Sequence, residues 1–137
     1  MDDQRPKVGT GVIIFKDNKV LLGKRKSIHG NGAWSFPGGH LEHKESFEDC
    51  VKRETKEEAG IEIKDIEFIW ATNDIFEENE KHYVTIFMKA NYASGEIKIT
   101  EPDKWEKWEW FDVEDLPENL FLPIRNLFKV WQLKNYS

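Results

Sequence analysis

Three glutamates in one short segment, Glu54, Glu57 and Glu58, are the residues of this sequence best suited to chemistry. Their spacing of i, i+3 and i+4 would place the three carboxylates close together on one side of a helix. Such crowding of negative charge is unfavourable unless a cation neutralises it. A hard divalent ion with oxygen ligands, Mg²⁺ or alternatively Mn²⁺, is the ion that this set would bind.

The segment around these glutamates, residues 46–59, is predicted to be a helix. Ser46 can cap its N-terminus, and Gly60 suits its C-terminal end. The acidic pair Glu48 and Asp49 favours the first turn. At about 100° per residue, the apolar stripe of this helix consists of Phe47, Cys50 and Val51.

Two of the glutamates, Glu54 and Glu58, continue the apolar stripe, and Glu57 lies at its border. The opposite, solvent-facing side is expected to hold Glu48, Asp49, Lys52 and Lys56. Surface glutamates in ion pairs with Lys or Arg are the alternative interpretation. It fits poorly, because a surface helix normally directs its carboxylates away from its apolar face. The inward placement therefore favours a metal site.

The rest of the chain is predicted to form strands and a second helix. Strands are expected at residues 8–15, 19–25, 33–36, 61–70, 82–90, 96–100 and 105–111. A glycine-containing loop is expected at residues 27–32 and a C-terminal helix at residues 123–133. Strands around one central helix, with a terminal helix, predict a mixed α/β sandwich.

Length and composition predict a single domain over residues 1–137. The chain is 39% hydrophobic with six Trp and nine Phe, which is typical of a packed globular protein. One Cys excludes an internal disulfide and suits a reducing cytoplasm. The polar N-terminus lacks the apolar run of a signal peptide, and no stretch approaches the roughly 18 apolar residues of a membrane span. We therefore expect a cytoplasmic protein without a membrane partner.

The net charge of −6 argues against long nucleic acid as a partner, since polyanion binders usually present a basic face. It does not argue against a small phosphorylated substrate, because an acidic site that holds divalent cations attracts phosphate.

The segment from Gly39 to Ile61 resembles the Nudix box, whose pattern is Gly-x5-Glu-x7-Arg-Glu-U-x-Glu-Glu-x-Gly-U, with U apolar. Every fixed residue of this pattern is present. Thr55 occupies an apolar slot, and Lys44 stands where many members have Gly. Further segments, residues 9–11, 21–26, 36–42, 82–85 and 108–110, look like MutT-related nucleotide hydrolases. The likeness is closest to the nucleoside-triphosphate pyrophosphatase branch that includes human Nudix hydrolase fifteen and plant dihydroneopterin-triphosphate hydrolases.

The resemblance implies the Nudix α/β/α sandwich, with a mixed β-sheet and a loop-helix-loop. It implies these metal ligands: the Gly38 carbonyl, Glu54, Glu57 and Glu58. Arg53 would orient Glu54 through a salt bridge, and Glu45 would brace the loop and help at the metal site. Family members often take a further acid from outside the box, and Glu101 and Glu106 are both candidates. A homodimer is a further expectation from the resemblance.

Four residues are candidates for substrate binding. Arg25 could hold a phosphate with its fork and is preferred to Lys24, although both could be solvated charges at a strand end. Gly39 lets the backbone approach a ligand. His40 is the next residue and could face the site, or it could have no role in binding. Thr85 matches a base-pocket position of the resembling branch, or is simply core.

The expected reaction is attack of a metal-activated water on phosphorus, with Glu54 or Glu57 as the base. The Pro and Tyr markers that the family associates with ADP-ribose and dinucleoside polyphosphates are absent downstream of the box. Their absence favours conversion of a (deoxy)nucleoside triphosphate to the monophosphate and pyrophosphate. ADP-ribose, a nucleotide sugar or a pterin triphosphate are alternative substrates. A non-catalytic nucleotide sensor is the alternative of a different class.

Overall fold

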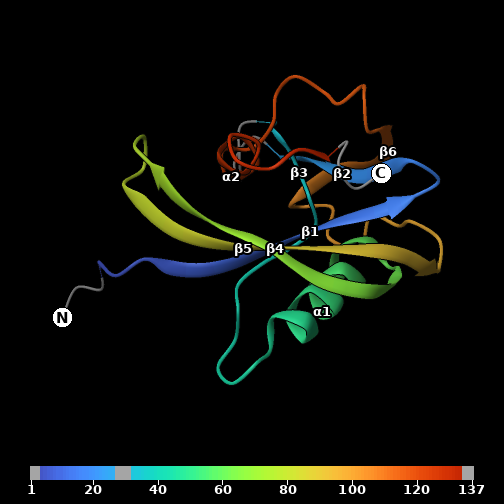
Figure 1. Cartoon of the computed structure of the whole chain (residues 1–137), viewed down its shortest axis with the longest axis horizontal. Helices are drawn as coiled ribbons and strands as arrows, with labels where there is room; N and C mark the ends of the chain where they lie inside the picture. Colours follow the sequence, from blue (N-terminus) through green and yellow to red (C-terminus); the bar gives the residue numbers. More distant parts are fainter. Residues whose placement is uncertain (1–3, 27–31, 134–137) are drawn as a thin grey trace.

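A six-stranded mixed sheet with one helix on each side organises the computed structural model, which describes residues 4–26 and 32–133 (Figure 1). The strands are β1 (Lys7–Lys16), β2 (Lys19–Arg25), β3 (Trp34–Ser35), β4 (Glu62–Phe76), β5 (Lys81–Ser94) and β6 (Trp105–Asp112). The helices are α1 (Phe47–Ala59) and α2 (Leu122–Leu127).

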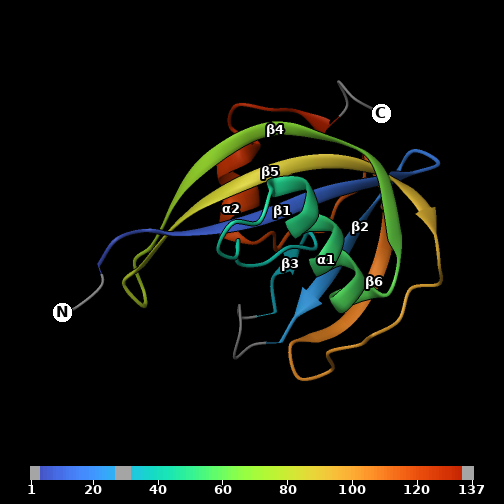
Figure 2. The same cartoon turned by 90° about the horizontal axis from the view of Figure 1, so that it is seen from below.

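The strand order is β3-β2-β1-β5-β4, and β6 pairs with the remaining side of β2. The β1–β5 pair is parallel, whereas the other pairs are antiparallel. The hairpin of β1 and β2 is paired only next to its turn, at Phe15–Val20 and Lys16–Lys19. Strand β2 pairs with β6 along its whole length, but beyond the turn it diverges from β1 and pairs with β3 instead, so the sheet opens between β1 and β2 (Figure 2).

The two faces of the sheet bury separate apolar clusters. On β1, Val12 and Ile14 face α1, while Ile13 faces α2, as strand alternation requires. Helix α1 adds Val51 and Ala59 to the first cluster. Helix α2 adds Ile124 and Leu127 to the second. Both views show α1 and α2 on opposite sides of β1, β5 and β4, which confirms the predicted mixed α/β sandwich.

Two predicted elements are wrong in part. Residues 96–100 form no strand, because Lys98 N donates to Ala59 O at 3.0 Å and the segment follows the end of α1 instead. The terminal helix ends at Leu127, where turn-like bonds begin, such as Val130 N to Leu127 O at 3.0 Å. Strands β4 and β5 extend beyond the predicted bounds, and residues 27–31 of the predicted loop lie outside the described residues.

Neither helix in the described ranges has the length and apolar character that crossing a membrane requires.

Candidate metal and phosphate site

The loop that leads into α1 runs along the first half of β1. Thr10 N donates to Gly39 O at 2.7 Å, and Val12 N donates to Pro37 O at 2.8 Å. The loop lies so close to its neighbours that only glycine fits at Gly38, and a Cβ at Gly39 would require the Glu54 side chain to move. A Cβ on Gly38 would stand 1.9 Å from Thr10 O, and a Cβ on Gly39 would stand 2.2 Å from Glu54 Oε2. These glycines therefore bring backbone directly against a box glutamate.

Helix α1 begins and ends at the predicted signals. The Ser46 hydroxyl accepts a hydrogen bond from Asp49 N at 3.0 Å, which satisfies one free amide of the first turn. Gly60 adopts the left-handed region with φ of 77° and closes the helix on Lys56 O. Cys50 and Val51 are fully buried as predicted, whereas Phe47, in the first turn, is 40% exposed.

The three box glutamates differ in burial. Glu58 is 6% exposed and accepts a hydrogen bond from Gly38 N at 3.0 Å. The Glu54 side chain is 15% exposed, and that of Glu57 is 52% exposed. Burial raises the pKa of Glu54, and it raises that of Glu58 well above the ordinary value. Negatively charged neighbours raise the pKa of both residues further, so the positive charge around Glu54 and Glu58 does not balance the negative charge.

Arg53 connects the helix to the loop and forms the ion pair with Glu54 that the sequence resemblance implied. Its guanidinium binds Glu45 through two bonds, Nε to Oε2 at 2.8 Å and Nη2 to Oε1 at 3.0 Å. Its Nη1 donates to Glu54 at 3.2 Å and to Glu57 at 3.0 Å. These bonds to Arg53 lower the pKa of Glu45 to about 2. Arg53 thus fixes the direction of two box carboxylates at once.

The carboxylates of the described residues do not form a preassembled metal-binding geometry. Within residues 4–26 and 32–133, no group of three or more His, Cys, Asp or Glu side chains stands at metal-binding distances. Glu57 is instead engaged in an ion pair with Arg53 on the same helix, at 3.0 Å. The donor set is nevertheless composed of oxygens, which suits a hard divalent cation.

The structure distinguishes the two candidate acids from outside the box. Glu101 lies near enough for its charge to raise the pKa of both Glu54 and Glu58. The Thr100 hydroxyl donates to Glu57 O, which holds this segment against α1. Glu106 instead faces Lys24, with 3.9 Å between the charged atoms. Glu101, and not Glu106, therefore adjoins the box glutamates.

Arg25 lies between the glutamates and a group of aromatic rings. Its guanidinium carbon is 4.2 Å from the centroid of the Phe121 ring and 5.3 Å from that of Trp105. Burial lowers the pKa of Arg25, and the charges of Glu58 and Tyr83 oppose that shift. The predicted phosphate residue is thus a half-buried cation beside the acidic helix, and not a solvated charge at a strand end.

The aromatic rings beside Arg25 form a wall, here defined as Phe76, Tyr83 and Phe121. Ring centroids of Phe76 lie 6.1 Å from Tyr83 and 5.5 Å from Phe121. The predicted residue His40 joins this wall, because its Nε2 is 3.1 Å from the Tyr83 hydroxyl. Burial and three nearby lysines lower the pKa of His40, so its ring is neutral at pH 7.

Sequence reasoning missed Phe76 and Tyr83 as site residues. Strand alternation could have found Tyr83, because it shares a face of β5 with the predicted residue Thr85. Thr85 itself is buried, and its hydroxyl donates to Asp74 Oδ2 at 2.6 Å. Its hydroxyl hydrogen is therefore already engaged within the protein.

The tryptophans of β6 are core residues. Trp105 and Trp108 are 4% and 9% exposed, and their rings lie 4.4 Å apart. Trp108 Nε1 donates to Glu58 O at 3.1 Å, which ties the C-terminal turn of α1 to β6. A Cβ on Gly23 would stand 2.6 Å from the Trp108 ring, so β2 approaches the pair closely.

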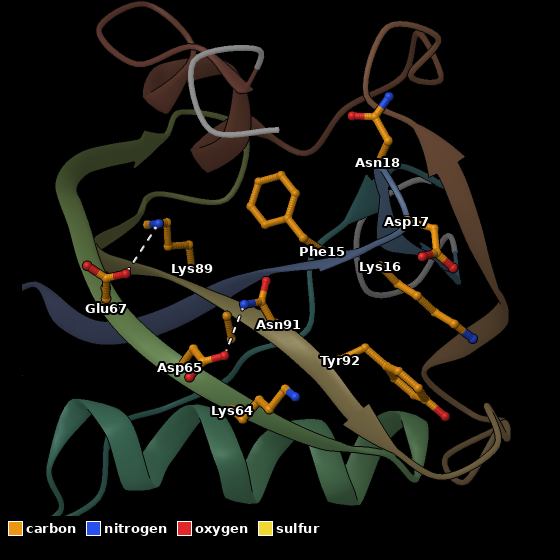
Figure 3. A pocket seen from close by; sticks show the side chains of 11 residues that line it. Phe15, Lys16, Asp17, Asn18, Lys64, Asp65, Glu67, Lys89, Asn91 and Tyr92 are labelled. Atoms are coloured by element: carbon orange, nitrogen blue, oxygen red, sulfur yellow. Dashed lines mark hydrogen bonds and ion pairs between the residues drawn. The ribbon is translucent and has the colours of Figure 1, made fainter.

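One hollow of the described surface lies away from the glutamates, at the turn end of β1 (Figure 3). Its volume is about 590 Å³. The charges that line it largely neutralise one another, as in the 3.3 Å pair of Lys89 with Glu67. Asn91 donates to Asp65 at 3.1 Å in the same hollow. None of the candidate site residues lines this hollow.

Comparison with known proteins agrees with the site. The NUDIX domain model matches residues 5–130. An ADP-ribose pyrophosphatase from Methanocaldococcus jannaschii is 35% identical over 118 residues, covering 85% of this chain and 68% of the relative. The NAD-capped RNA hydrolase NudC of Pseudomonas putida is 35% identical over 106 residues, covering 77% of this chain. The chain spans only 36% of the length of that NudC.

Solved structures lead to the same family. The crystal structure of a MutT NUDIX hydrolase from Burkholderia pseudomallei has 35% sequence identity and a TM-score of 0.83. The alignment covers 93% of this chain and 99% of that chain. Together with the complete box on α1, these matches show that the chain belongs to the Nudix family of hydrolases.

Proposed function

We propose that the protein is a Mg²⁺-dependent pyrophosphohydrolase that converts a (deoxy)nucleoside triphosphate to the monophosphate and pyrophosphate. The observation that supports this most directly is the position of Arg25, a cation between the box glutamates and an aromatic wall. A triphosphate with an attached base has the matching sequence of chemical groups: phosphates for the metal and for Arg25, and a flat ring for the wall.

The box residues fit a divalent cation. Besides burial, the charge of Glu101 raises the pKa of both Glu54 and Glu58, and Arg53 offsets only part of the shift at Glu54. Glu54, Glu57 and Glu58 with the Gly38 carbonyl would hold the cation, and Glu101 would add a further acid. A bound cation would neutralise phosphate oxygens and ease the deprotonation of the attacking water.

The chain's own residues would then orient the reaction. Arg53 holds Glu54 and Glu57 in fixed directions through bonds of 3.2 and 3.0 Å, and Glu45 holds Arg53. One of these two glutamates accepts the proton of the attacking water. The fork of Arg25 would bind phosphate oxygens. His40, being neutral, can donate a hydrogen bond to the substrate or to Tyr83 without adding charge.

A second substrate has a specific observation in its favour. The relative from Methanocaldococcus jannaschii, 35% identical to this chain, is named an ADP-ribose pyrophosphatase. ADP-ribose presents the same diphosphate and adenine to the site, but it replaces the third phosphate with a ribose. A nucleotide sugar or a pterin triphosphate would use the same groups.

The test is hydrolysis of a panel of nucleoside triphosphates, deoxynucleoside triphosphates and ADP-ribose with Mg²⁺, comparing wild type with Glu57→Gln. We expect a triphosphate to be the best substrate and the variant to lose about 10²–10⁴-fold in kcat. Glu48→Gln is the matched control, because Glu48 lies on the exposed side of the same helix, where it pairs with Lys52 at 3.8 Å. ADP-ribose as the best substrate would replace the triphosphate assignment. Binding without turnover of any phosphoanhydride would leave the non-catalytic sensor.

A further inference from the structure

A fully buried carboxylate lies in β4, away from the box glutamates. Asp74 is 0% exposed. It accepts hydrogen bonds from three side chains, one each from β4, β5 and α2. Thr72 Oγ1 donates to its Oδ2 at 3.0 Å, and Thr85 Oγ1 donates to the same oxygen at 2.6 Å. Asn126 Nδ2, from α2, donates to its Oδ1 at 2.9 Å. Each oxygen of the buried acid therefore has an assigned partner.

Burying a carboxylate is unfavourable in free energy, compared with burying an apolar side chain. Removing it from water costs several kcal/mol unless hydrogen bonds replace the lost hydration. A purely structural position under α2 could be filled by an apolar residue, as Ile124 and Leu127 do nearby. What the acid adds is direction, because each of its oxygens accepts from defined donors. The arrangement thus fixes the position of α2 relative to β4 and β5.

Asp74 is connected on both sides to the aromatic wall of Phe76, Tyr83 and Phe121. On the sheet side, Asp74 pairs with Tyr83 in the β4–β5 register and lies two residues before Phe76, on the same strand face. On the helix side, Asn126 belongs to α2, whose N-cap is Phe121. Phe121 N also donates to Trp34 O at 2.9 Å, and this bond ties the backbone of Phe121 to β3.

We propose that Asp74 is a positioning residue for substrate binding: through Asn126 it sets the separation of Phe121 from Phe76 and Tyr83, and hence the space that receives the base. This rests on the proposed function for the identity of the substrate. The role does not involve the phosphates, because the hydrogen bonds of the acid run to Thr72, Thr85 and Asn126, which belong to β4, β5 and α2. Its loss should therefore weaken recognition of the base and leave phosphate chemistry intact.

The asymmetry of the hydrogen bonds provides a sharp test. In Asp74→Asn, the amide oxygen can still accept from both threonines, but the amide nitrogen then faces the donating nitrogen of Asn126. The second change Asn126→Asp restores the pair with donor and acceptor exchanged. We expect Asp74→Asn to raise KM for a nucleoside triphosphate about tenfold, which corresponds to about 1.4 kcal/mol. The double variant should recover most of this loss.

A base-free substrate separates positioning from general structural damage. For methyl triphosphate, kcat and KM of Asp74→Asn should stay within about twofold of wild type. Thr72→Val is the matched control, since it removes one donor to Asp74 and leaves the link to Asn126. It should lower the melting temperature without raising KM for the nucleotide. An equal loss with both substrates, or no recovery in the double variant, would overturn the proposal.

Binding without turnover keeps this proposal separate from the proposed reaction. Calorimetric titration with a methylene-bridged nucleoside triphosphate measures Kd whether or not the protein hydrolyses it. We expect the same tenfold weakening in Asp74→Asn and recovery in the double variant. Wild type that binds the analogue but hydrolyses no triphosphate would refute the reaction alone. Unchanged Kd in Asp74→Asn would refute the positioning role alone.

Discussion

Glu54 lies against the backbone of Gly39 so closely that a Cβ on residue 39 would stand 2.2 Å from its carboxylate. Gly39→Ala must therefore displace Glu54 or push the loop away from β1. A displacement of about 1 Å at a catalytic group can cost about 10²-fold in rate, and we expect a loss of that size in kcat/KM with Mg²⁺.

Gly9→Ala is the matched control for this change. Its added Cβ would meet only ordinary contacts, at 3.7 Å from Gly39 O and 3.9 Å from the Tyr83 ring. Its melting temperature should stay close to that of wild type, and its kcat/KM should stay within about threefold of wild type. Full activity in Gly39→Ala would show that the position of Glu54 is not needed for the reaction.

Arg25 is the second position where the site makes a quantitative prediction. Arg25→Lys keeps the charge but removes the planar fork and its contact with the Phe121 ring at 4.2 Å. We expect KM for a nucleoside triphosphate to rise about tenfold with a smaller change in kcat. Lys24→Gln, one residue earlier and paired with Glu106 at 3.9 Å, should have a KM close to wild type. A KM of Arg25→Lys close to that of wild type would assign Arg25 to long-range charge alone.

Local patterns in the sequence predicted the acidic helix almost to the residue. Ser46, the register of Glu54 and Glu58, and Gly60 all act within a few positions of one another, and the structure has each of them as expected. The resemblance to the Nudix box also implied the ion pair of Arg53 with Glu54, whereas the bonds of Arg53 to Glu45 were not predicted. These features needed no knowledge of distant contacts.

Features that depend on distant contacts escaped prediction. The segment at residues 96–100 has the composition of a strand, but Gly95 turns at φ of 101° and Lys98 bonds to the end of α1. His40 meets Tyr83 across 43 positions of sequence. Such pairings follow from the parallel β1–β5 register, which no local pattern specifies. The choice between Glu101 and Glu106 likewise required the fold.

Removal of the acid at position 101 should weaken metal binding. Glu101 raises the pKa of Glu54 and Glu58, so it stands where its charge would act on a bound cation. Glu101→Gln should raise the Mg²⁺ concentration for half-maximal activity several-fold, whereas Glu106→Gln should not. A metal titration of initial rates at saturating substrate measures this. The reverse order of the two variants would exclude Glu101 as a ligand.

The ion pair of Glu45 with Arg53 predicts a pH dependence of stability. The folded-state pKa of Glu45 is about 2, below the ordinary value of 4.5. A depressed carboxylate pKa contributes stability above pH 4.5, and this contribution is lost as the pH falls towards 2. The difference in the free energy of unfolding between wild type and Glu45→Gln should therefore be constant near neutral pH and shrink across that window. A difference that grew on acidification would contradict the assigned pair.

Thr55 offers a prediction about stability alone. It fills an apolar slot of the box, is 0% exposed, and its hydroxyl has no hydrogen-bond partner among the described residues. A buried hydroxyl without a partner costs about 1–3 kcal/mol, and valine has nearly the same shape. We expect Thr55→Val to raise the free energy of unfolding by about 1 kcal/mol in urea titrations and to leave kcat/KM unchanged. Thr85→Val is the contrasting control, because it removes the 2.6 Å bond to the buried Asp74 and should destabilise the fold. If both variants lost stability, the Thr55 hydroxyl would have a partner that solvent provides.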